Sequence, residues 1–273
     1  MSSLTNKYGQ WALVTGASSG IGKEIARQLA SKGFNLVLVA RRKKILDELA
    51  CDIKINNRVE TLIVASDLSR PGAVKALYDS VSKLDIGLIV PAAGVDAMGR
   101  FLEKDYTDLE SMLLLNILVP TEITHIFGQN MVNRKRSGII LISSLFGYQG
   151  IPNFAAYAAS KAYILTLGET LNVELAHQGV DVLVLSPGLT DTPFSQKMDI
   201  DFSKLPMYAQ RPETVARTAL NALGKKPTVV SGWLNKIYAW ENRFIPRAWP
   251  VMLFCFLINR AIKAHASKKQ VTT

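Results

Sequence analysis

The sequence predicts an α/β fold in which helices cover both faces of a parallel β-sheet. Short apolar runs of strand length alternate along the chain with longer segments whose apolar residues recur every three or four positions. The strand runs are apolar throughout, which is typical of strands buried on both faces. Glycine, proline and small polar residues separate the segments, as expected for turns.

The first half of the chain shows this alternation most clearly. Apolar runs predict four strands within residues 11–22, 34–40, 59–67 and 85–94. Helical spacing predicts three helices at residues 23–33, 43–56 and 71–83. Gly33 ends the first of these helices and Pro71 starts the third, which are the helix positions that glycine and proline favour.

The second half continues in the same way. Helices are predicted at residues 106–133, 152–177 and 211–226, and strands within 137–144, 179–188 and 227–232. The whole pattern indicates a Rossmann-type doubly wound parallel sheet in a single domain, residues 1–232. Residues 233–273 follow as an apolar and basic helical extension.

Charge and cysteine content exclude several classes of function. The chain has a net charge of +10, but nine Lys/Arg and one acid fall after residue 224, so +8 belongs to residues 225–273 and nucleic-acid binding is not expected. Cys51 and Cys255 are isolated and the three histidines are scattered, so we expect neither a disulfide framework nor a metal site. The polar first ten residues lack the apolar stretch of a signal peptide, which favours a cytoplasmic protein.

The segment "TGASSGIG" joins the first strand to the first helix. Its glycines permit a tight turn and let the backbone approach a pyrophosphate, while the helix N-terminus directs amides at the anion. The alternative is a glycine turn that binds no ligand. The predicted cofactor contacts here are Gly16, Ser18, Ser19, Gly20, Ile21 and Gly22.

The second strand ends in "VARRKK", where dinucleotide folds choose between NAD and NADP. Ala40 stands where an acid would bind the ribose 2′-hydroxyl of NAD, and Arg41 and Arg42 follow. A guanidinium can bind the 2′-phosphate of NADP in a bidentate manner. The sequence therefore favours NADP(H), the alternative being a basic helix start that only meets solvent.

Together the motifs resemble the classical short-chain dehydrogenase/reductase family over roughly residues 8–232. They occur in the family's order and spacing: "TGASSGIG", "SDL", "AAG", "LN", "ISS", "YAASK" and "SPG". One departure is Pro91, which replaces the first asparagine of the family's "NNAG". Beyond the glycine segment, the resemblance implies cofactor contacts at Asp67, Leu68, Ala93, Gly94, Pro187, Gly188, Thr190 and Thr192.

The segment "YAASK" implies the reaction. Tyr157 and Lys161 are four residues apart and share a helix face. A cation about 5 Å away, at an effective dielectric of ~20, interacts with a phenolate by roughly 3 kcal/mol, or about two pKa units. Lys161 is therefore predicted to lower the pKa of Tyr157 enough for general acid/base work. The alternative is an ordinary tyrosine and lysine on a helix surface.

The resemblance completes a catalytic set around this pair. Ser144, thirteen residues before Tyr157, matches the family's catalytic serine, and Asn116 its active-site asparagine. Ser144 would stabilise the substrate oxygen, and Asn116 would hold a water in a proton relay. Lys161, with Tyr157 and Asn116, would also contact the cofactor. No metal is expected.

Apolar residues surround the expected substrate site and suggest a small lipophilic carbonyl or alcohol. They are Leu145, Phe146, Ile151, Phe154, Phe194, Leu205, Met207 and Tyr208. The predicted function is an NADP(H)-dependent oxidoreductase. The alternative is a non-catalytic nucleotide-binding or membrane-associated scaffold protein on the same fold, although such a protein needs no Ser144, Tyr157 and Lys161 set.

The extension holds three of the four tryptophans and the apolar run "VMLFCFLI". This run is too short to span a bilayer, which takes about 20 residues, and Pro246 and Pro250 are expected to break the helix before it. Residues 233–265, including Lys236, Arg243 and Arg247, suggest a peripheral membrane contact. The alternative is a cap over the pocket or a contact with a partner subunit. By resemblance, helices 106–133 and 153–177 would form a homodimer or tetramer.

Overall fold

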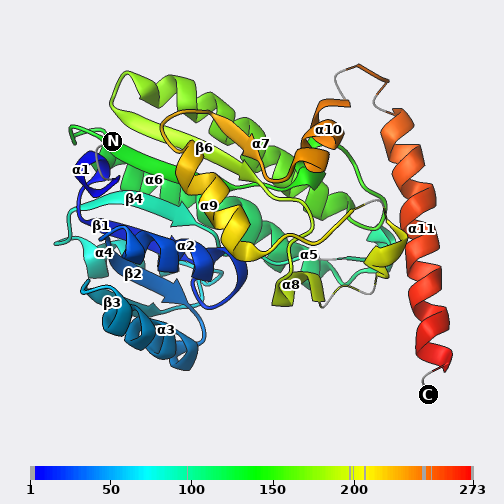
Figure 1. The fold of residues 1–273 in the computed structure, drawn as a ribbon, viewed down its shortest axis with the longest axis horizontal. Helices are drawn as coiled ribbons and strands as arrows, with labels where there is room; N and C mark the ends of the chain where they lie inside the picture. Colours follow the sequence, from blue (N-terminus) through cyan, green and yellow to red (C-terminus); the bar gives the residue numbers. More distant parts are fainter. Residues whose placement is uncertain are drawn as a thin grey trace.

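Seven parallel strands form one sheet in the order β3-β2-β1-β4-β5-β6-β7 (Figure 1). The computed structural model describes residues 4–96, 98–196, 198, 200–205, 207–241, 244–246 and 248–271, of which 263–271 by backbone alone. The strands are β1 (Trp11–Thr15), β2 (Asn35–Ala40), β3 (Thr61–Ala65), β4 (Ile86–Pro91), β5 (Ser137–Ile142), β6 (Val180–Ser186) and β7 (Thr228–Val230). Strand order reverses between β1 and β4, which is where ligands bind in doubly wound sheets. The predicted fold class is confirmed.

Two apolar layers hold helices on the two faces of the sheet (Figure 1). One layer lies under α2 (Gly20–Ser31), α3 (Lys43–Asn56) and α9 (Pro212–Ala222), and the other under α4 (Ala73–Val81), α6 (Val119–Met131) and α7 (Ala155–Ala176). Adjacent strand residues point into opposite layers: Leu13 enters the second and Val14 the first. Burial on both faces explains why the strands are apolar throughout.

The long helix predicted at residues 106–133 is not continuous α-helix. It consists of α5 (Tyr106–Leu113), a π-helical turn (Leu114–Leu118) and α6. The combined stretch Tyr106–Met131 is long and apolar enough to cross a membrane by length and composition. Ile123, Phe127 and Met131 pack against the sheet, however, so its apolar character is that of a core helix.

Several short elements escaped prediction from the sequence. These are the helices α1 (Leu4–Tyr8) and α8 (Pro193–Gln196) and the 3₁₀ turns η1 (Phe101–Glu103), η3 (Leu145–Tyr148) and η4 (Phe202–Lys204). Each is five residues or shorter, so its apolar spacing gives almost no periodic signal. Tyr8 of α1 is fully buried and donates a hydrogen bond to Asp181 at 2.7 Å, which ties the N-terminus to β6.

The extension forms α10 (Trp233–Glu241) and α11 (Ala248–Val271), and α11 runs along one end of the molecule (Figure 1). The expectation that Pro250 breaks the helix is wrong. Pro250 is the third residue of α11, where its missing N–H group would have no partner in the helix anyway. Arg243 and Arg247, which belong with Lys236 to the predicted membrane contact, lie outside the described residues.

Helix α7 can lie close to the sheet because residue 168 is glycine. A Cβ atom there would be 2.3 Å from Val184 Cγ2 and 3.0 Å from Leu141 Cδ1, both on buried strands. Gly128 of α6 offers a matched control, since a Cβ there meets no described atom within 4 Å.

We expect Gly168→Ala to lower the free energy of unfolding by about 1–2 kcal/mol, because overpacking outweighs the gain in helix propensity. Gly128→Ala should leave it unchanged or raise it by up to about 1 kcal/mol. Chemical denaturation of both variants measures the difference. Equal effects of the two substitutions would contradict this account of α7 packing.

Candidate active site

The glycine segment forms a tight turn between β1 and α2. Gly16 has a φ of +65°, and a Cβ on it would lie 2.9 Å from the backbone of Ala92. A Cβ on Gly22 would lie 2.7 Å from the Gly16 carbonyl oxygen, so the helix also needs glycine to pack here. Ser19 is the N-cap of α2, and its side chain makes no capping hydrogen bond, which leaves first-turn amides for an anion. The turn therefore fits a pyrophosphate.

The loop after β6 folds over this turn. A Cβ on Gly20 would lie 3.2 Å from Thr192 Cγ2. The loop is held by its own hydrogen bonds: Ser195 Oγ and Thr192 Oγ1 both donate to the Thr190 carbonyl, at 2.7 and 3.3 Å. The glycine turn and the loop after β6 thus lie side by side, and Pro187 and Gly188 connect this loop to the end of β6.

Two arginines stand at the end of β2. Both are exposed, and Arg42 Nη2 donates to Ser18 Oγ at 3.0 Å, which brings its guanidinium to the glycine turn. Arg41 lies close enough to Asp67 to affect it: the pKa of Asp67 is lowered chiefly by its hydrogen bond with Ser69, and the charge of Arg41 lowers it further. Leu68, next to Asp67, is buried. The end of β2 therefore places two exposed guanidinium groups beside the glycine turn.

Asn116 sits in the π-helical turn, which directs its side chain inward. It is 1% exposed, and its amide clamps the loop after β4: Nδ2 donates to the Val95 carbonyl at 2.8 Å, and Oδ1 accepts from Val95 N at 3.0 Å. Nδ2 also lies 3.3 Å from Ser160 Oγ on α7. A Cβ on Gly94 would come within 3.1 Å of Asn116 Oδ1, so the loop needs glycine at that point. Ala93 precedes it and donates its N–H to Thr15 Oγ1.

Tyr157, Lys161 and Ser144 come together where α7 crosses the end of β5. Lys161 Nζ donates to the Ile142 carbonyl at 3.1 Å and lies 5.7 Å from the centre of the Tyr157 ring. Ser144 caps the 3₁₀ turn η3, accepts a hydrogen bond from Phe146 N, and hydrogen-bonds to the Tyr157 hydroxyl. The structure brings all four predicted catalytic residues into one cluster.

The predicted net lowering of the Tyr157 pKa is not found: the net shift is upward, and Lys161 is not among its causes. Burial raises the pKa of Tyr157 above its ordinary value; the hydrogen bond with Ser144 lowers it, and the negative charge of Asp96 raises it again. Burial lowers the pKa of Lys161 to about 8. Both side chains are less than a tenth exposed, and burial disfavours the charged form of each, so it moves the two pKa values in opposite directions.

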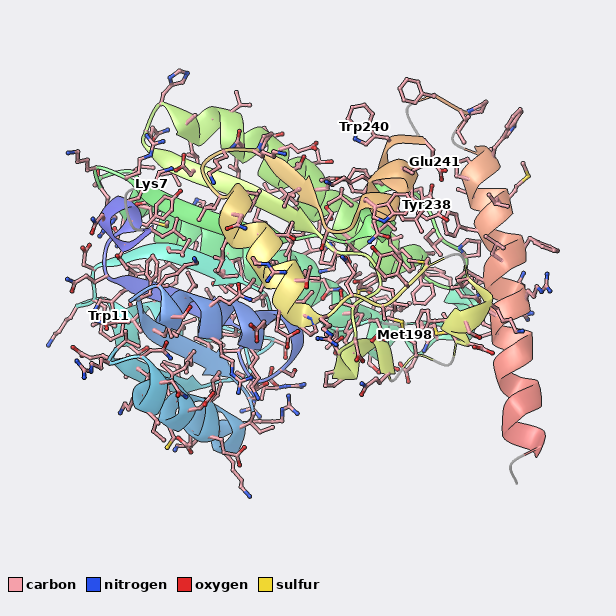
Figure 2. The ribbon with its side chains drawn as sticks, viewed as in Figure 1. Lys7, Trp11, Met198, Tyr238, Trp240 and Glu241 are labelled. Atoms are coloured by element: carbon pink, nitrogen blue, oxygen red, sulfur yellow. The ribbon has the colours of Figure 1, made fainter. Side chains whose placement is uncertain are left out.

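Aromatic side chains surround the Tyr157 ring. Phe146, Phe154 and Phe194 lie with ring centres 5.9–6.4 Å from it. This ring set belongs to a larger apolar cluster that α11 closes from outside, with Met198 between α8 and α11 (Figure 2). Ile151, Leu205 and Met207 belong to it as predicted, whereas Leu145 packs in a separate cluster with Val230 and Ala239, and Tyr208 is half exposed.

Three site residues escaped the sequence analysis. Ser160 links Asn116 to the Tyr157 carbonyl, to which it donates at 2.7 Å. Asp96 acts on Tyr157 electrostatically, and Asn235 of α10 is buried against Gly188, where a Cβ would lie 2.3 Å from its side chain. Ser160 lies within the segment "YAASK" and could have been identified there. Asp96 lies in the loop after β4 and Asn235 in the extension, and no local sequence pattern predicts that either one reaches the site.

Sequence comparison places the chain among known proteins. A profile described as short chain dehydrogenase matches residues 10–201. The chain is 38% identical over 241 residues to a 7beta-hydroxysteroid dehydrogenase of Clostridium sardiniense, covering 88% of this chain and 92% of that one. It is 29% identical over 270 residues to the inactive hydroxysteroid dehydrogenase-like protein 1 of Rattus norvegicus, covering 98% and 81%.

Solved structures agree with the sequence relatives. A 7beta-hydroxysteroid dehydrogenase structure superimposes with a TM-score of 0.84 at 30% identity, covering 93% of this chain and 99% of that one. A short-chain dehydrogenase from Sphingobium yanoikuyae in complex with NADPH superimposes with a TM-score of 0.75, also at 30% identity, covering 81% and 86%. Fold, motifs and relatives agree, and the chain belongs to the short chain dehydrogenase family of oxidoreductases.

Proposed function

We propose that this protein is an NADP(H)-dependent oxidoreductase that transfers a hydride between the nicotinamide and a carbonyl or alcohol carbon of a lipophilic substrate. One observation carries the proposal: the Tyr157 hydroxyl is hydrogen-bonded to Ser144, with Lys161 5.7 Å from its ring, inside an aromatic enclosure. The cofactor, when bound, supplies the hydride. What the chain must supply is a proton and stabilisation of charge on the substrate oxygen.

Tyr157 is suited to be the proton donor. Its raised pKa keeps the phenol protonated at neutral pH, which is the state that reduction of a carbonyl needs. The Ser144 hydroxyl lies beside it and can donate to the same substrate oxygen as negative charge develops there. Oxidation of an alcohol would require Tyr157 to lose its proton first, so these surroundings favour reduction.

Lys161 and Asn116 support the same site by hydrogen bonding. With a pKa of about 8, Lys161 is mostly protonated at pH 7, and its ammonium has two N–H groups besides the one directed at the Ile142 carbonyl. We assign one of these N–H groups to the nicotinamide ribose and the other to the side facing Tyr157. Asn116, whose polar atoms bond Val95 and Ser160, holds the loop after β4 against α7 and thereby positions Gly94.

NADP rather than NAD is favoured by Arg41 and Arg42. Their guanidinium groups stand at the end of β2, where Ala40 provides no carboxylate to repel a phosphate. The NADPH complex of the Sphingobium relative supports this choice. The pyrophosphate would be held by the glycine turn at Gly16, Gly20 and Gly22. The nicotinamide end of the cofactor would be held by Thr190 and Thr192.

The substrate is proposed to be a steroid-sized ketone or alcohol. The cluster around Tyr157 consists of aromatic and aliphatic side chains, and Ile200, Phe254 and Ile258 extend it beyond the ring set. The names of the Clostridium relative and of the solved structure with a TM-score of 0.84 point to the same substrate class.

A non-catalytic role is the second candidate, because the Rattus relative is described as inactive. Against it stands the complete Ser144, Tyr157 and Lys161 set, which a protein that only binds nucleotide does not need. Assembly into a homodimer or tetramer remains a prediction. Exposed apolar side chains on α7 and the π turn, among them Leu118 and Val173, would provide its contact.

Tyr157→Phe should lower kcat/KM for NADPH-dependent reduction of a ketosteroid at least about a hundredfold, because it removes the proton donor and keeps the ring. NADPH affinity, measured by fluorescence titration, should stay within about twofold, because the glycine turn, Arg41 and Lys161 are unchanged in this variant. Tyr163→Phe is the matched control on the same helix, where the hydroxyl accepts a hydrogen bond from Thr121. Near-wild-type turnover by Tyr157→Phe would refute the assignment.

Arg41→Asp should weaken NADPH binding about ten- to a hundredfold while leaving NADH binding unchanged or stronger, because a carboxylate repels the 2′-phosphate. Lys44→Asp makes the same charge change at an exposed position of α3 and should have a much smaller effect. Both affinities are measured by titrating cofactor fluorescence. If the two variants shift the NADPH/NADH ratio equally, recognition of the 2′-phosphate lies elsewhere.

The buried Lys161 makes stability depend on pH. The folded protein releases the Lys161 proton near pH 8, whereas the unfolded chain keeps it to about 10.5, so the unfolded state binds more protons between these values. The free energy of unfolding should therefore rise over this interval, by up to about 3 kcal/mol relative to Lys161→Met, which has nothing to titrate there. Denaturant curves of both proteins at pH 7 and pH 10, without cofactor, test this. Parallel behaviour of the two would show that Lys161 is not buried as described.

A further inference from the structure

Helix α11 has two apolar faces. Phe254, Ile258 and Ala261 are buried in the cluster that contains Tyr157. On the opposite side Trp249, Met252, Leu253 and Phe256 are 54–65% exposed, at the i, i+3, i+4 and i+7 spacing that forms one stripe. The first face explains how the helix attaches to the domain. The second contacts nothing in the described part of the chain that would cover it.

Helix α10 carries a second outward stripe of the same kind. Trp233, Ile237 and Trp240 are 53–67% exposed at i, i+4 and i+7, while Asn235 and Ala239 on the other side are buried. Figure 2 shows Trp240 pointing away from the sheet, at the end of the molecule where α11 begins. Phe244 and Ile245, between the two helices, are exposed as well. The two stripes and this connection place nine large exposed apolar residues in 24 consecutive positions.

The charged residues around the exposed apolar stripes indicate which kind of partner this surface would bind. Lys236 lies exposed in the stripe of α10, and Arg260 continues that of α11 by one turn. The chain after residue 224 carries a net charge of +8, with Glu241 as its single acid. Tryptophan beside lysine and arginine is the composition of a helix that lies at a lipid headgroup boundary, and positive charge favours anionic lipids. A contact between two copies of this surface would instead bring like charges together.

The length of the helix determines how it would lie. Its apolar part, Ala248–Ile262, is about 22 Å long at 1.5 Å per residue, short of the ~30 Å hydrocarbon core. Its inner face is already committed to the protein. Only the outer face is left for lipid, so α11 would lie in the plane of the membrane surface.

We propose that the outward face of α10 and α11 is a docking surface for an anionic lipid membrane. The face consists of the two stripes and the connection between them. Because α11 separates this face from the apolar cluster at Tyr157, docking would place the substrate site one helix away from the bilayer. The proposal does not depend on the reaction, and it stands even if the protein has no catalytic activity.

Flotation of the full-length protein with vesicles tests the proposal directly. Vesicles of phosphatidylcholine with about one third phosphatidylserine should bind the wild-type protein, with binding falling as salt is raised. The double variant Leu253→Glu/Phe256→Glu should bind at least about tenfold more weakly. The matched control is Ile55→Glu, which puts the same charge on an exposed apolar position of α3, at the other end of the molecule. It should bind like the wild type.

A second pair of variants separates charge from apolar contact. Lys236→Glu/Arg260→Glu should lose binding to the anionic vesicles more than to pure phosphatidylcholine vesicles. The mass of each protein in solution, from light scattering, keeps self-association apart from lipid binding. The proposal is overturned if the wild type does not float with anionic vesicles, or if Ile55→Glu weakens binding as much as the double variant. It is equally overturned if the stripe variants change the oligomer mass and leave vesicle binding unchanged.

Discussion

The burial of an ionisable pair on one turn of α7 is the constraint on which the rest of the site depends. Tyr157 and Lys161 are both less than a tenth exposed. Burial disfavours the charged form of each side chain, so neighbouring polar groups must stabilise them. The Ile142 carbonyl accepts from the lysine, and Ser144 hydrogen-bonds to the tyrosine. These partners stand at the end of β5, which α7 can reach because Gly168 lets the helix approach the sheet.

The same burial underlies the direction of reaction that we propose. A tyrosine whose pKa is raised is a poor base but remains a proton donor over the whole neutral range. A lysine with a pKa of about 8 is charged at pH 7 and loses its charge soon above it. Under the proposed function, these two protonation states suit the pair to protonating an oxyanion on the substrate.

Much of this could be predicted from sequence because the signals are local. Continuous apolar runs indicated a sheet buried on both faces, and the segments around Gly16 and Tyr157 carry their chemistry within a few residues. Properties that arise from packing could not be predicted. The π turn that directs Asn116 inward, the contact of Asn235 with Gly188, and the opposite pKa shifts of Tyr157 and Lys161 all depend on segments distant in sequence. Pro250 does not break α11, contrary to the prediction, because a proline is tolerated in the first turn of a helix.

The central claim is that a protonated Tyr157 and a charged Lys161 act together in reduction. The pH dependence of kcat/KM for NADPH-dependent reduction of a ketosteroid tests it most directly, because that profile reports groups of the free enzyme. The account predicts a rate that is constant from about pH 6 and falls above about pH 8 as Lys161 loses its proton. A rate that rises with pH through this range would mean that the site works by a deprotonated tyrosine, and would contradict it.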